Sequence, residues 1–356
     1  MQLYFLWFVQ RKLSNYQPEE RQTAKKILPV SVIICARNEA ENLAKNLEKV
    51  LQQDYPDFEV IVVNDCSSDR SDDVLRDFQE RYQHLKVVKI EEHPRYKTAK
   101  KFAATLGIKA ASHEILIFTD ADCEPASSSW IEIMASHYQN NETEIVLGYS
   151  PYFKERGFLN KLIRYETFQT ALNYFSFALY GMPYMGVGRN LSYKKSLFFK
   201  GKGFAAHMHI PSGDDDLFVN QNATAQNVAI EVREDAQVWS TPKGTWKAYW
   251  QQKLRHIGAG KIYKKQHKVY LSLQASSAIC FYALGFTGLI LSIEPYFLLG
   301  AFLLRFLIQF YIFYKPVGRF QNKDLLWWFI LLDPFYYIYL TGLNVVGLFS
   351  KKISWK

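Results

Sequence analysis

Carboxylates stand in this chain at points where an apolar run has just ended. Asp120 and Asp122 follow the apolar residues 115–118 and are separated by one residue. Hard divalent cations take oxygen ligands and leave coordination positions open for phosphate oxygens. The pair therefore predicts a site where Asp122 and Asp120 hold Mg²⁺ or Mn²⁺ against a diphosphate. A solvated turn is the ordinary alternative for such a triplet, and the preceding apolar run favours the metal site.

Further acids follow earlier apolar runs. Asp65 comes after residues 60–63 and can accept a hydrogen bond from a nucleobase or a ribose hydroxyl. Asp69, a few residues later, is expected to cap the next helix. Glu39 closes the segment 36–39. It can hold a ribose, or it can be the first-turn acid of its helix, where the helix dipole favours a negative charge.

Lysines lie between these acidic positions. Lys100 and Lys101 begin an alanine-rich helical stretch at residues 100–111. An ammonium group at the start of this helix can meet the charge of a diphosphate. The lysines can equally form a solvated basic face, and both interpretations remain open.

A second acidic site is the triplet Asp214-Asp215-Asp216, which stands between Gly213 and Leu217. Three adjacent carboxylates repel one another, so at least one is expected to have a raised pKa or a basic partner. A carboxylate beside a hydroxyl acceptor is the general base that group transfer requires. The triplet can also be the acidic N-terminus of a helix, and the two roles are compatible.

A polar and basic pair follows in the segment 251–256. Gln252 and Arg255 are three residues apart, which places them on one face of a helix. Arg255 can neutralise a leaving diphosphate. The alternative is a basic helix at a membrane surface, which also accounts for Lys253 and the lysines after it.

The order of apolar and amphipathic segments indicates how these groups are brought together. The expected strands cover residues 30–35, 58–63, 85–90 and 114–118, and the expected helices begin near residue 38 and cover 71–81 and 100–111. Alternation at this spacing predicts βαβ units and a mostly parallel sheet. Ligands of such sheets bind beyond the carboxyl ends of the strands, where the polar clusters fall. One pocket is therefore predicted.

Composition divides the chain into two parts. The 356 residues include 49% hydrophobic and 22% charged residues and carry a formal net charge of +9. Gly, Pro and Cys are modest, which excludes collagenous, disordered and disulfide-rich classes. Most of the formal charge precedes Lys268, and apolar and aromatic residues dominate the last quarter. We expect a charged catalytic body and a membrane anchor, with the basic excess facing membrane lipids and no nucleic acid partner.

Three apolar segments near the C-terminus are candidate membrane spans. Residues 270–293 have no charged residue and residues 296–314 have only Arg305. Both are long enough to cross about 30 Å of hydrocarbon. Residues 325–350 contain Asp333-Pro334, which is expected to kink or break the helix. Two or three full spans are therefore predicted.

The N-terminal segment is apolar but too short to cross a bilayer. It can be the end of a clipped span, an interfacial helix or a strip that packs on the C-terminal helices. Tyr4, Trp7 and Phe8 favour the interfacial helix, because aromatic rings suit headgroup depth. Residues 10–28 are expected to be a linker, and residues 168–180 a buried or interfacial helix.

Basic residues predict the orientation in the membrane. The lysines and arginines of residues 253–268 place the catalytic body in the cytoplasm by the positive-inside rule. The basic tail at 351–356 also favours the cytoplasm, whereas three full spans would place it outside. Either the last segment re-enters the same side or the tail departs from the rule. We expect a multi-pass protein of the inner (plasma) membrane.

Taken in order, these motifs resemble those of the family 2 inverting glycosyltransferases. The matching residues run from about Pro29 to His256, and the C-terminal segments look like those of membrane-bound members. The resemblance implies a GT-A fold and a nucleotide-sugar donor, with a UDP-sugar as the first guess. It also implies a glycan or lipid-linked acceptor and a divalent metal, Mg²⁺ or Mn²⁺.

The resemblance further implies roles for individual residues. Glu39 and Asp65 would bind the nucleoside, Asp120 would meet the donor near its ribose and phosphate, and Asp122 would ligate the metal. Further residues implied on the donor side are Ala36, Arg37 and Lys100. Those implied on the acceptor or diphosphate side are Arg189, Gln252, Arg255 and His256.

Two positions depart from the family's pattern. His256 stands where the Q-x-x-R-W motif has Trp, which weakens the case for a processive polymerase. Gly213 stands where an acid is common. The implied general base is Asp214, and Asp215 is its near rival.

The sequence thus predicts four regions. These are an interfacial segment and linker at 1–28, a GT-A glycosyltransferase domain at 29–268, membrane helices at 269–350 and a basic tail at 351–356. The expected function is transfer of a sugar with inversion to a hydroxyl acceptor in cell-surface glycan or glycolipid synthesis. A polyprenyl-phosphate sugar transferase is the alternative. Its acceptor is already an anion, so a general base is less needed and the acidic triplet would have another role. A catalytically inert membrane scaffold is a second alternative, disfavoured by the intact set of acids.

Overall fold

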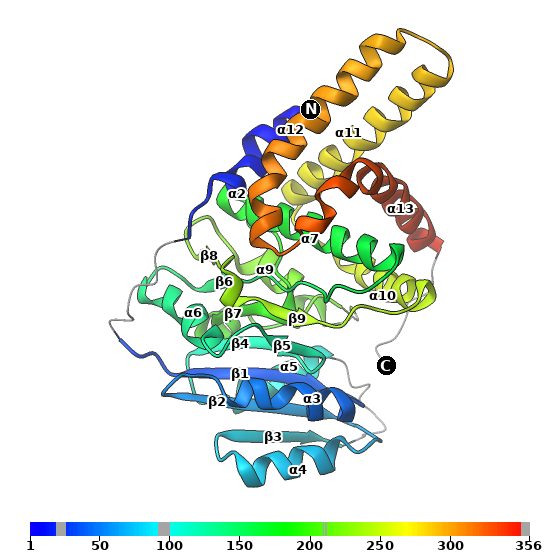
Figure 1. Ribbon diagram of the computed structural model, residues 1–356. Coiled ribbons are helices and arrows are strands. Elements are labelled where there is room, and N and C mark those ends of the chain that lie inside the picture. The colour runs from blue at the N-terminus through cyan, green and yellow to red at the C-terminus, as the bar shows by residue number, and fades with distance from the viewer. Residues whose placement is uncertain (19–25, 92–99, 209, 211, 350–356) are drawn as a thin grey trace.

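The computed structural model describes residues 1–18, 26–91, 100–208, 210 and 212–349 (Figure 1). Its centre is a seven-stranded sheet with the order β3-β2-β1-β4-β7-β6-β8. The strands of this sheet are β1 Val30–Ala36, β2 Phe58–Asp65, β3 Leu85–Ile90, β4 Ile115–Asp120, β6 Ile145–Leu147, β7 Leu191–Lys194 and β8 Val228–Ile230. A second, two-stranded sheet pairs β5 (Cys123–Pro125) with β9 (Val238–Ser240).

The first four strands of the sheet are parallel, as the alternation of apolar and amphipathic runs predicted. β1 pairs in parallel with β2 and with β4, and β2 pairs in parallel with β3. β7 is antiparallel to both β4 and β6. The predicted fold class, a mostly parallel sheet flanked by helices, is confirmed.

Helices cover both faces of the sheet. Those of the body are α3 Ala40–Leu51, α4 Ser71–Arg81, α5 Lys100–Ala110, α6 Trp130–Ser136, α7 Phe158–Leu179, α8 Lys195–Lys200, α9 Asp216–Asn222 and α10 Trp246–Gly260. Successive strand residues point to opposite faces, so Val32 packs with α3, α4 and α6, and Ile33 packs with α5 and α7. At Gly107 of α5 a Cβ atom would lie 2.8 Å from Ile33, which shows how closely this helix approaches the sheet.

The N-terminal segment is a helix that packs on other helices. It runs from Gln2 to Asn15 through three consecutive segments, α1 (Gln2–Tyr4), η1 (Phe5–Gln10) and α2 (Arg11–Asn15). One face is buried against α7 and α12, with Phe5, Leu6, Val9 and Leu13 at most 7% exposed. The expectation that a linker begins at residue 10 is therefore wrong, because the apolar face continues to Leu13.

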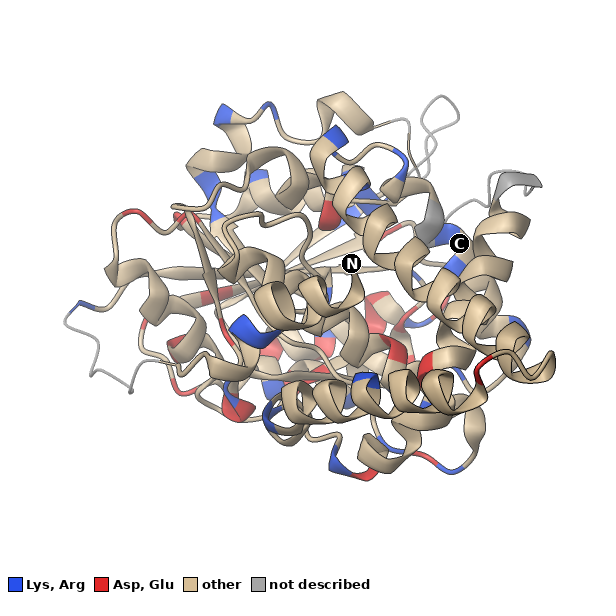
Figure 2. Ribbon diagram, turned by 90° about the horizontal axis from the view of Figure 1, so that it is seen from above, with Lys and Arg blue, Asp and Glu red and all other residues tan. Residues whose placement is uncertain are grey.

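Three long helices form the C-terminal part of the chain. They are α11 Lys265–Ile290, α12 Pro295–Arg319 and α13 Phe329–Phe349, and a short helix, η6 Lys323–Trp328, precedes α13. α11 and α12 project away from the body, and α13 lies beside their lower part, near α7 and α10 (Figure 1). α11, α12 and the continuous stretch Lys323–Gly347, which joins η6 to α13, are long and apolar enough to cross a membrane. Figure 2, seen from above the view of Figure 1, shows long stretches of helix without a charged residue. The buried core is continuous from the sheet through α7 to α12.

α13 is unbroken at Asp333-Pro334, so the predicted break is wrong. Pro334 lies inside a helix that continues to Phe349. The carboxylate of Asp333 is buried and bonded to Arg305 of α12, Tyr165 of α7 and Tyr282 of α11. These contacts hold the helix in place at the residue before the proline.

Candidate functional site

A narrow cavity lies at the carboxyl ends of β1 and β4. It contains four polar residues that the sequence singled out, Lys100, Asp120, Asp214 and Asp215. They come from the start of α5, the end of β4 and the loop before α9. The position agrees with the single pocket predicted beyond the carboxyl ends of the parallel strands.

Lys100 bridges two of these carboxylates. Its Nζ lies 2.9 Å from Oδ1 of Asp120 and 3.3 Å from Oδ2 of Asp214. Burial lowers the pKa of Lys100, but these two carboxylates raise it by more, and it stands well above its ordinary value. Lys100 is therefore a permanent positive charge at the centre of the cavity, not part of a solvated basic face.

Asp215 is bound by the backbone. Its Oδ2 accepts a hydrogen bond from the N–H of Gly188 at 2.7 Å, and its Oδ1 accepts one from the N–H of Asp216 at 2.7 Å. Burial, followed by the neighbouring charge of Asp214, raises the pKa of Asp215. Asp215 thus caps α9 and ties this helix to the loop of Gly188.

Asp216 points to a different partner. Its Oδ2 accepts a hydrogen bond from the hydroxyl of Tyr263 at 2.8 Å, and its Oδ1 accepts one from the N–H of Leu217. Burial, followed by the charge of Asp215, raises the pKa of Asp216 to about 7. The expectation for the triplet is confirmed, because Asp215 and Asp216 have raised pKa values and Asp214 has a lysine partner.

The turns after β1 and β2 are joined by side-chain caps. Asn38 and Cys66 both adopt left-handed backbone conformations, with φ of 55° and 53°. Oδ1 of Asn38 accepts a hydrogen bond from the N–H of Ser68, and Asp69 accepts bonds from the N–H groups of Ala40 and Ser71. Asp69 therefore caps α4, as expected, and also α3. These caps fix the edge of the sheet where the nucleoside residues are predicted.

The predicted nucleoside residues lie at this edge. Ala36 ends β1 and lies opposite Asn64 of β2, and Asp65, the last residue of β2, is fully buried. Arg37 follows in the turn after β1. Burial, followed by the charge of Asp122 and opposed by a hydrogen bond from Asn42, raises the pKa of Glu39. Asp120 and Asp122 are therefore close enough to Glu39 for their charges to raise its pKa.

Arg189 lies over the ring of Tyr152 and is close enough to Asp120 and Asp122 to feel their charges. Its guanidinium lies 4.3 Å from the centre of the Tyr152 ring and donates from Nη2 to the carbonyl oxygen of Ser150 at 3.2 Å. Burial lowers the pKa of Arg189, and Tyr152, Cys123 and the two acids at 120 and 122 raise it by more. Nε2 of Gln252 makes a long hydrogen bond of 3.5 Å to the hydroxyl of Tyr152. Gln252 and Arg189 therefore share one tyrosine.

The other residues of the 251–256 segment are placed less directly. α10 contains Gln252, Arg255 and His256, and the carbonyl oxygen of Arg255 accepts a hydrogen bond from Ser212 at 3.0 Å. The side chain of His256 lies outside the described part of the structure. Lys253 pairs with Glu166 of α7 at 2.7 Å, so its charge has a partner within the protein.

Lys101 holds a loop in position, a role that the sequence pattern does not distinguish from that of Lys100. It is buried, and its Nζ donates to the carbonyl oxygens of His207 at 2.7 Å and Ile210 at 3.1 Å. Burial lowers its pKa to about 8. Adjacent helix residues point in different directions, so Lys100 enters the cavity and Lys101 holds the loop before the acidic triplet.

The donor atoms present fit a divalent cation that is shared with a diphosphate. Asp122 is partly exposed, and within the described ranges its Oδ1 accepts a weak bond of 3.3 Å from Sγ of Cys123. Across the described residues, no three His, Cys, Asp or Glu side chains form a metal-binding group. Mg²⁺ commonly uses one or two carboxylates, with water and phosphate completing its shell. The pair Asp120 and Asp122 has this composition.

Comparisons with known proteins define the class. The model of glycosyl transferase family group 2 matches residues 116–343, and that of glycosyl transferase family 2 matches residues 31–200. The mannosyltransferase PcManGT from Pyrobaculum calidifontis, solved with GDP-Man and Mn²⁺, has the same fold. It is 19% identical with a TM-score of 0.59 and covers 90% of this chain and 95% of its own.

Curated relatives agree on the activity class. The probable glycosyltransferase YdaM of Bacillus subtilis is 28% identical over 72% of this chain and 62% of its own length. The glycosyltransferase AglE of Haloferax volcanii is 37% identical over 33% of this chain and 38% of its own. The chain thus spans less than two thirds of these relatives. The family models and the curated relatives define a transferase of the glycosyltransferase class. The chain belongs to glycosyltransferase family 2.

Proposed function

We propose that this protein is an inverting glycosyltransferase anchored in the membrane. It moves a sugar from a nucleoside diphosphate donor, with a UDP-sugar as the first candidate, to a hydroxyl group of a glycan or lipid-linked acceptor. The observation that carries the proposal is the contact of Lys100 with both Asp120 and Asp214 inside one cavity. This contact supports the proposal, because the reaction needs a cation for the diphosphate close to a carboxylate for the acceptor hydroxyl.

The proposed reaction is a single displacement. Asp214 accepts the proton of the acceptor hydroxyl while the hydroxyl oxygen attacks the anomeric carbon. The bond from that carbon to the phosphate oxygen breaks, and its electron pair leaves with the nucleoside diphosphate. Lys100 stabilises the negative charge that develops on this leaving group. Attack from the side opposite the leaving group inverts the anomeric configuration.

The geometry favours Asp214 over Asp215 as the base. Both oxygens of Asp215 already accept backbone hydrogen bonds, from Gly188 and Asp216. Asp214 contacts Lys100, and its side chain is 17% exposed. Because a general base needs an oxygen that can reach the acceptor, Asp214 suits the role better.

Asp122 and Asp120 would hold Mg²⁺ or Mn²⁺, which when bound would supply further positive charge at the diphosphate. Arg189, which lies over the Tyr152 ring, feels the charges of the same acids and orients donor or acceptor oxygens. Gln252 of α10 contacts the same tyrosine.

The protein is proposed to lie in the plasma membrane with its catalytic body in the cytoplasm. Three helices support the membrane placement. The lysines at 261, 264, 265 and 268, just before or at the start of α11, support the orientation.

A donor panel tests the function. Purified full-length protein is heated with UDP-sugars, GDP-mannose and other nucleotide sugars, with and without Mn²⁺. A matched donor raises Tm by mass action, and no shift with any unmatched donor is expected. The matched donor is then offered with oligosaccharides or with polyprenyl phosphate, and NMR reports the anomeric configuration of the product. Transfer only to polyprenyl phosphate would favour the alternative acceptor. A folded protein without donor binding, hydrolysis or transfer would favour an inert scaffold.

A further inference from the structure

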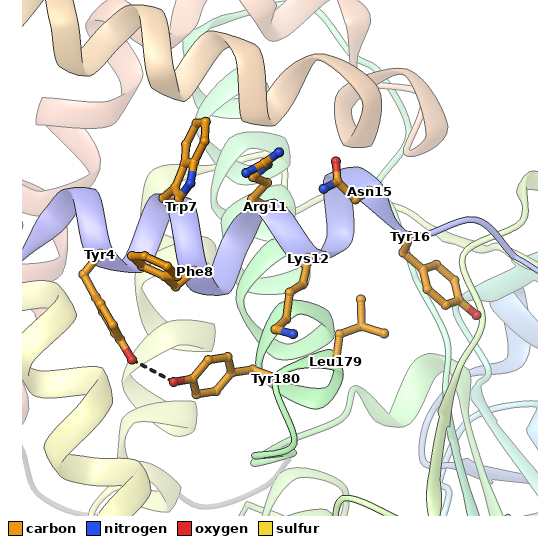
Figure 3. Close-up of a pocket in the computed structure, with 9 residues that line it drawn as sticks. All are labelled: Tyr4, Trp7, Phe8, Arg11, Lys12, Asn15, Tyr16, Leu179 and Tyr180. Atoms are coloured by element: carbon orange, nitrogen blue, oxygen red, sulfur yellow. Dashed lines mark hydrogen bonds between the residues drawn. The ribbon is translucent and has the colours of Figure 1, made fainter.

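An open hollow of about 660 Å³ lies beside the N-terminal helix, away from the proposed catalytic cavity (Figure 3). Its lining is aromatic and basic, and it is formed by Tyr4, Trp7, Phe8, Arg11, Lys12, Asn15, Tyr16, Leu179 and Tyr180. None of these nine residues carries a negative charge. This hollow is called the N-terminal hollow below.

Two cations border the N-terminal hollow. Arg11 lies 4.2 Å from the centre of the Trp7 ring, and Lys12 lies 5.8 Å from the centre of the Tyr180 ring. Among the described residues, the buried Nε of Arg11 has no hydrogen-bond partner. The guanidinium of Arg11 therefore packs on the Trp7 ring, and its Nε donor makes no hydrogen bond to the described residues.

Aromatic side chains form the other half of the lining. Figure 3 shows Tyr4, Phe8 and Lys12 on the side of the helix that faces the end of α7, and Trp7 and Arg11 on the opposite side, where Trp7 stacks on Tyr311 of α12. Tyr4 and Tyr180 share a hydrogen bond of 2.7 Å between their hydroxyl oxygens, which closes this side. Trp7 and Phe8 are 42% and 56% exposed, which is unusual for large apolar side chains unless lipid or a partner covers them.

Three contacts show where the N-terminal hollow lies along the length of α12. Gln2 accepts a hydrogen bond from Arg305, Trp7 stacks on Tyr311, and the carbonyl oxygen of Tyr16 accepts a bond from Arg319. The N-terminal helix therefore runs beside the second half of α12 in the same direction. The carbonyl oxygen of Arg319 accepts a bond from Gln237, so this end of α12 is the one at the catalytic body.

The cations consequently lie near the membrane surface and the rings lie deeper. Arg11 precedes the Tyr16–Arg319 contact by five residues, which is about 7 Å of helix at 1.5 Å per residue. Trp7 and Phe8 lie further along towards the apolar middle of α12. Basic groups at headgroup depth with aromatic rings beneath them are the usual arrangement of a membrane–water interface.

We propose that the N-terminal hollow binds the phosphate headgroup of an anionic phospholipid. Arg11 approaches the phosphate oxygens from the side of Trp7 and Lys12 from the side of Tyr180, and the acyl chains follow Trp7 and the exposed side chains of Leu307 and Tyr311 on α12. Charge complementarity and continuity with the exposed apolar face of α12 select this occupant. The inference rests on the proposed membrane placement of α11, α12 and α13.

Thermal unfolding in neutral detergent tests the site. Full-length protein is titrated with phosphatidylglycerol, with phosphatidylcholine or with inorganic phosphate. We expect phosphatidylglycerol to raise the wild-type Tm by several degrees more than phosphatidylcholine does. The double variant R11Q/K12Q should lose most of this difference. The control K265Q/K268Q removes the same number of positive charges at the start of α11. It should keep the full difference in Tm between the two lipids.

Different results would contradict different parts of the proposal. An unchanged response in R11Q/K12Q, or an equal loss in the control, would overturn the site. An equal rise with inorganic phosphate would overturn the lipid as its occupant. Each sample is also heated with the matched sugar donor. A wild type that responds to the donor but not to phosphatidylglycerol would overturn the lipid site and leave the proposed transferase intact.

Discussion

The ammonium group of Lys100 and the carboxylate of Asp214 lie 3.3 Å apart, although α5 carries one and the loop before α9 carries the other. The same ammonium lies 2.9 Å from Asp120 at the end of β4. A positive charge here lowers the repulsion between two carboxylates that face one cavity. When a donor binds, its diphosphate can compete for the same cation.

Lys100→Met should lower kcat by about 10²-fold, because one preorganised charge at the leaving group is lost. Steady-state transfer kinetics with the matched donor measure the change. Lys109→Met, at the exposed end of the same helix, is the matched control and should retain wild-type kinetics. Equal kinetics in wild type and Lys100→Met would exclude the proposed role.

Asp214→Asn should lower transfer by about 10²–10⁴-fold and leave donor binding nearly intact, because only proton acceptance is removed. Asp215→Asn should retain more activity and lower Tm, since it weakens the bonds to Gly188 and the α9 N-terminus. Transfer rates and donor titrations on both variants distinguish the two. Survival of transfer in Asp214→Asn together with its loss in Asp215→Asn would assign the base to Asp215.

Asp122→Ala should weaken the part of donor affinity that depends on Mn²⁺, because a carboxylate ligand is removed. Calorimetric titration of the donor with and without Mn²⁺ measures this part. Glu124→Ala is the control, since Glu124 lies two residues away and pairs with Lys49 at 2.6 Å. If Asp122→Ala kept the full metal dependence, Asp122 would not be a ligand.

Asp216 should make stability depend on pH. The ordinary pKa of an aspartic acid is 3.8, and burial raises the pKa of Asp216 in the folded protein to about 7. The folded state therefore binds the proton more tightly than the unfolded chain, and this contribution to stability is lost as pH rises through 7. Between pH 5 and pH 8, Tm of the wild type should fall relative to Tm of Asp216→Asn, which mimics the protonated acid. Parallel Tm curves would contradict the raised pKa.

Arg305 of α12 and Asp333 of α13 form a buried ion pair at 2.6 Å. Asp333→Leu should destabilise the protein by about 3–5 kcal/mol, because it leaves the guanidinium unpaired among apolar helices. The double variant R305M/D333L should recover much of this loss. Unfolding in detergent with a double-variant cycle measures the coupling. A cost below about 1 kcal/mol for Asp333→Leu would show that the pair is not coupled.

Much of the fold was predictable because local patterns decide it. Apolar runs of four to eight residues define strands, and a parallel sheet sends the groups after those runs to one edge. Asp65 and Asp120 were therefore placed correctly at strand ends, and the family resemblance agreed with the family models. The sequence also separated the charged body from the apolar helices.

The errors share one cause, which is that tertiary contacts override local signals. Pro334 was expected to break its helix, yet Asp333 is bonded to three other helices there. Residue 10 was expected to begin a linker, yet the helix continues to Asn15 because α7 and α12 cover its apolar face.

The amino-acid sequence by itself determined the alternation of the first four parallel strands with helices, the positions of acids at strand ends and the two-part distribution of charge. Only the tertiary structure decided that Lys100 enters the cavity while Lys101 holds a loop, and that Asp215 is bound by backbone N–H groups while Asp214 contacts Lys100. The physical reason is distance. Hydrogen bonds and ion pairs act over about 3 Å, and only the folded chain brings groups from remote segments that close together.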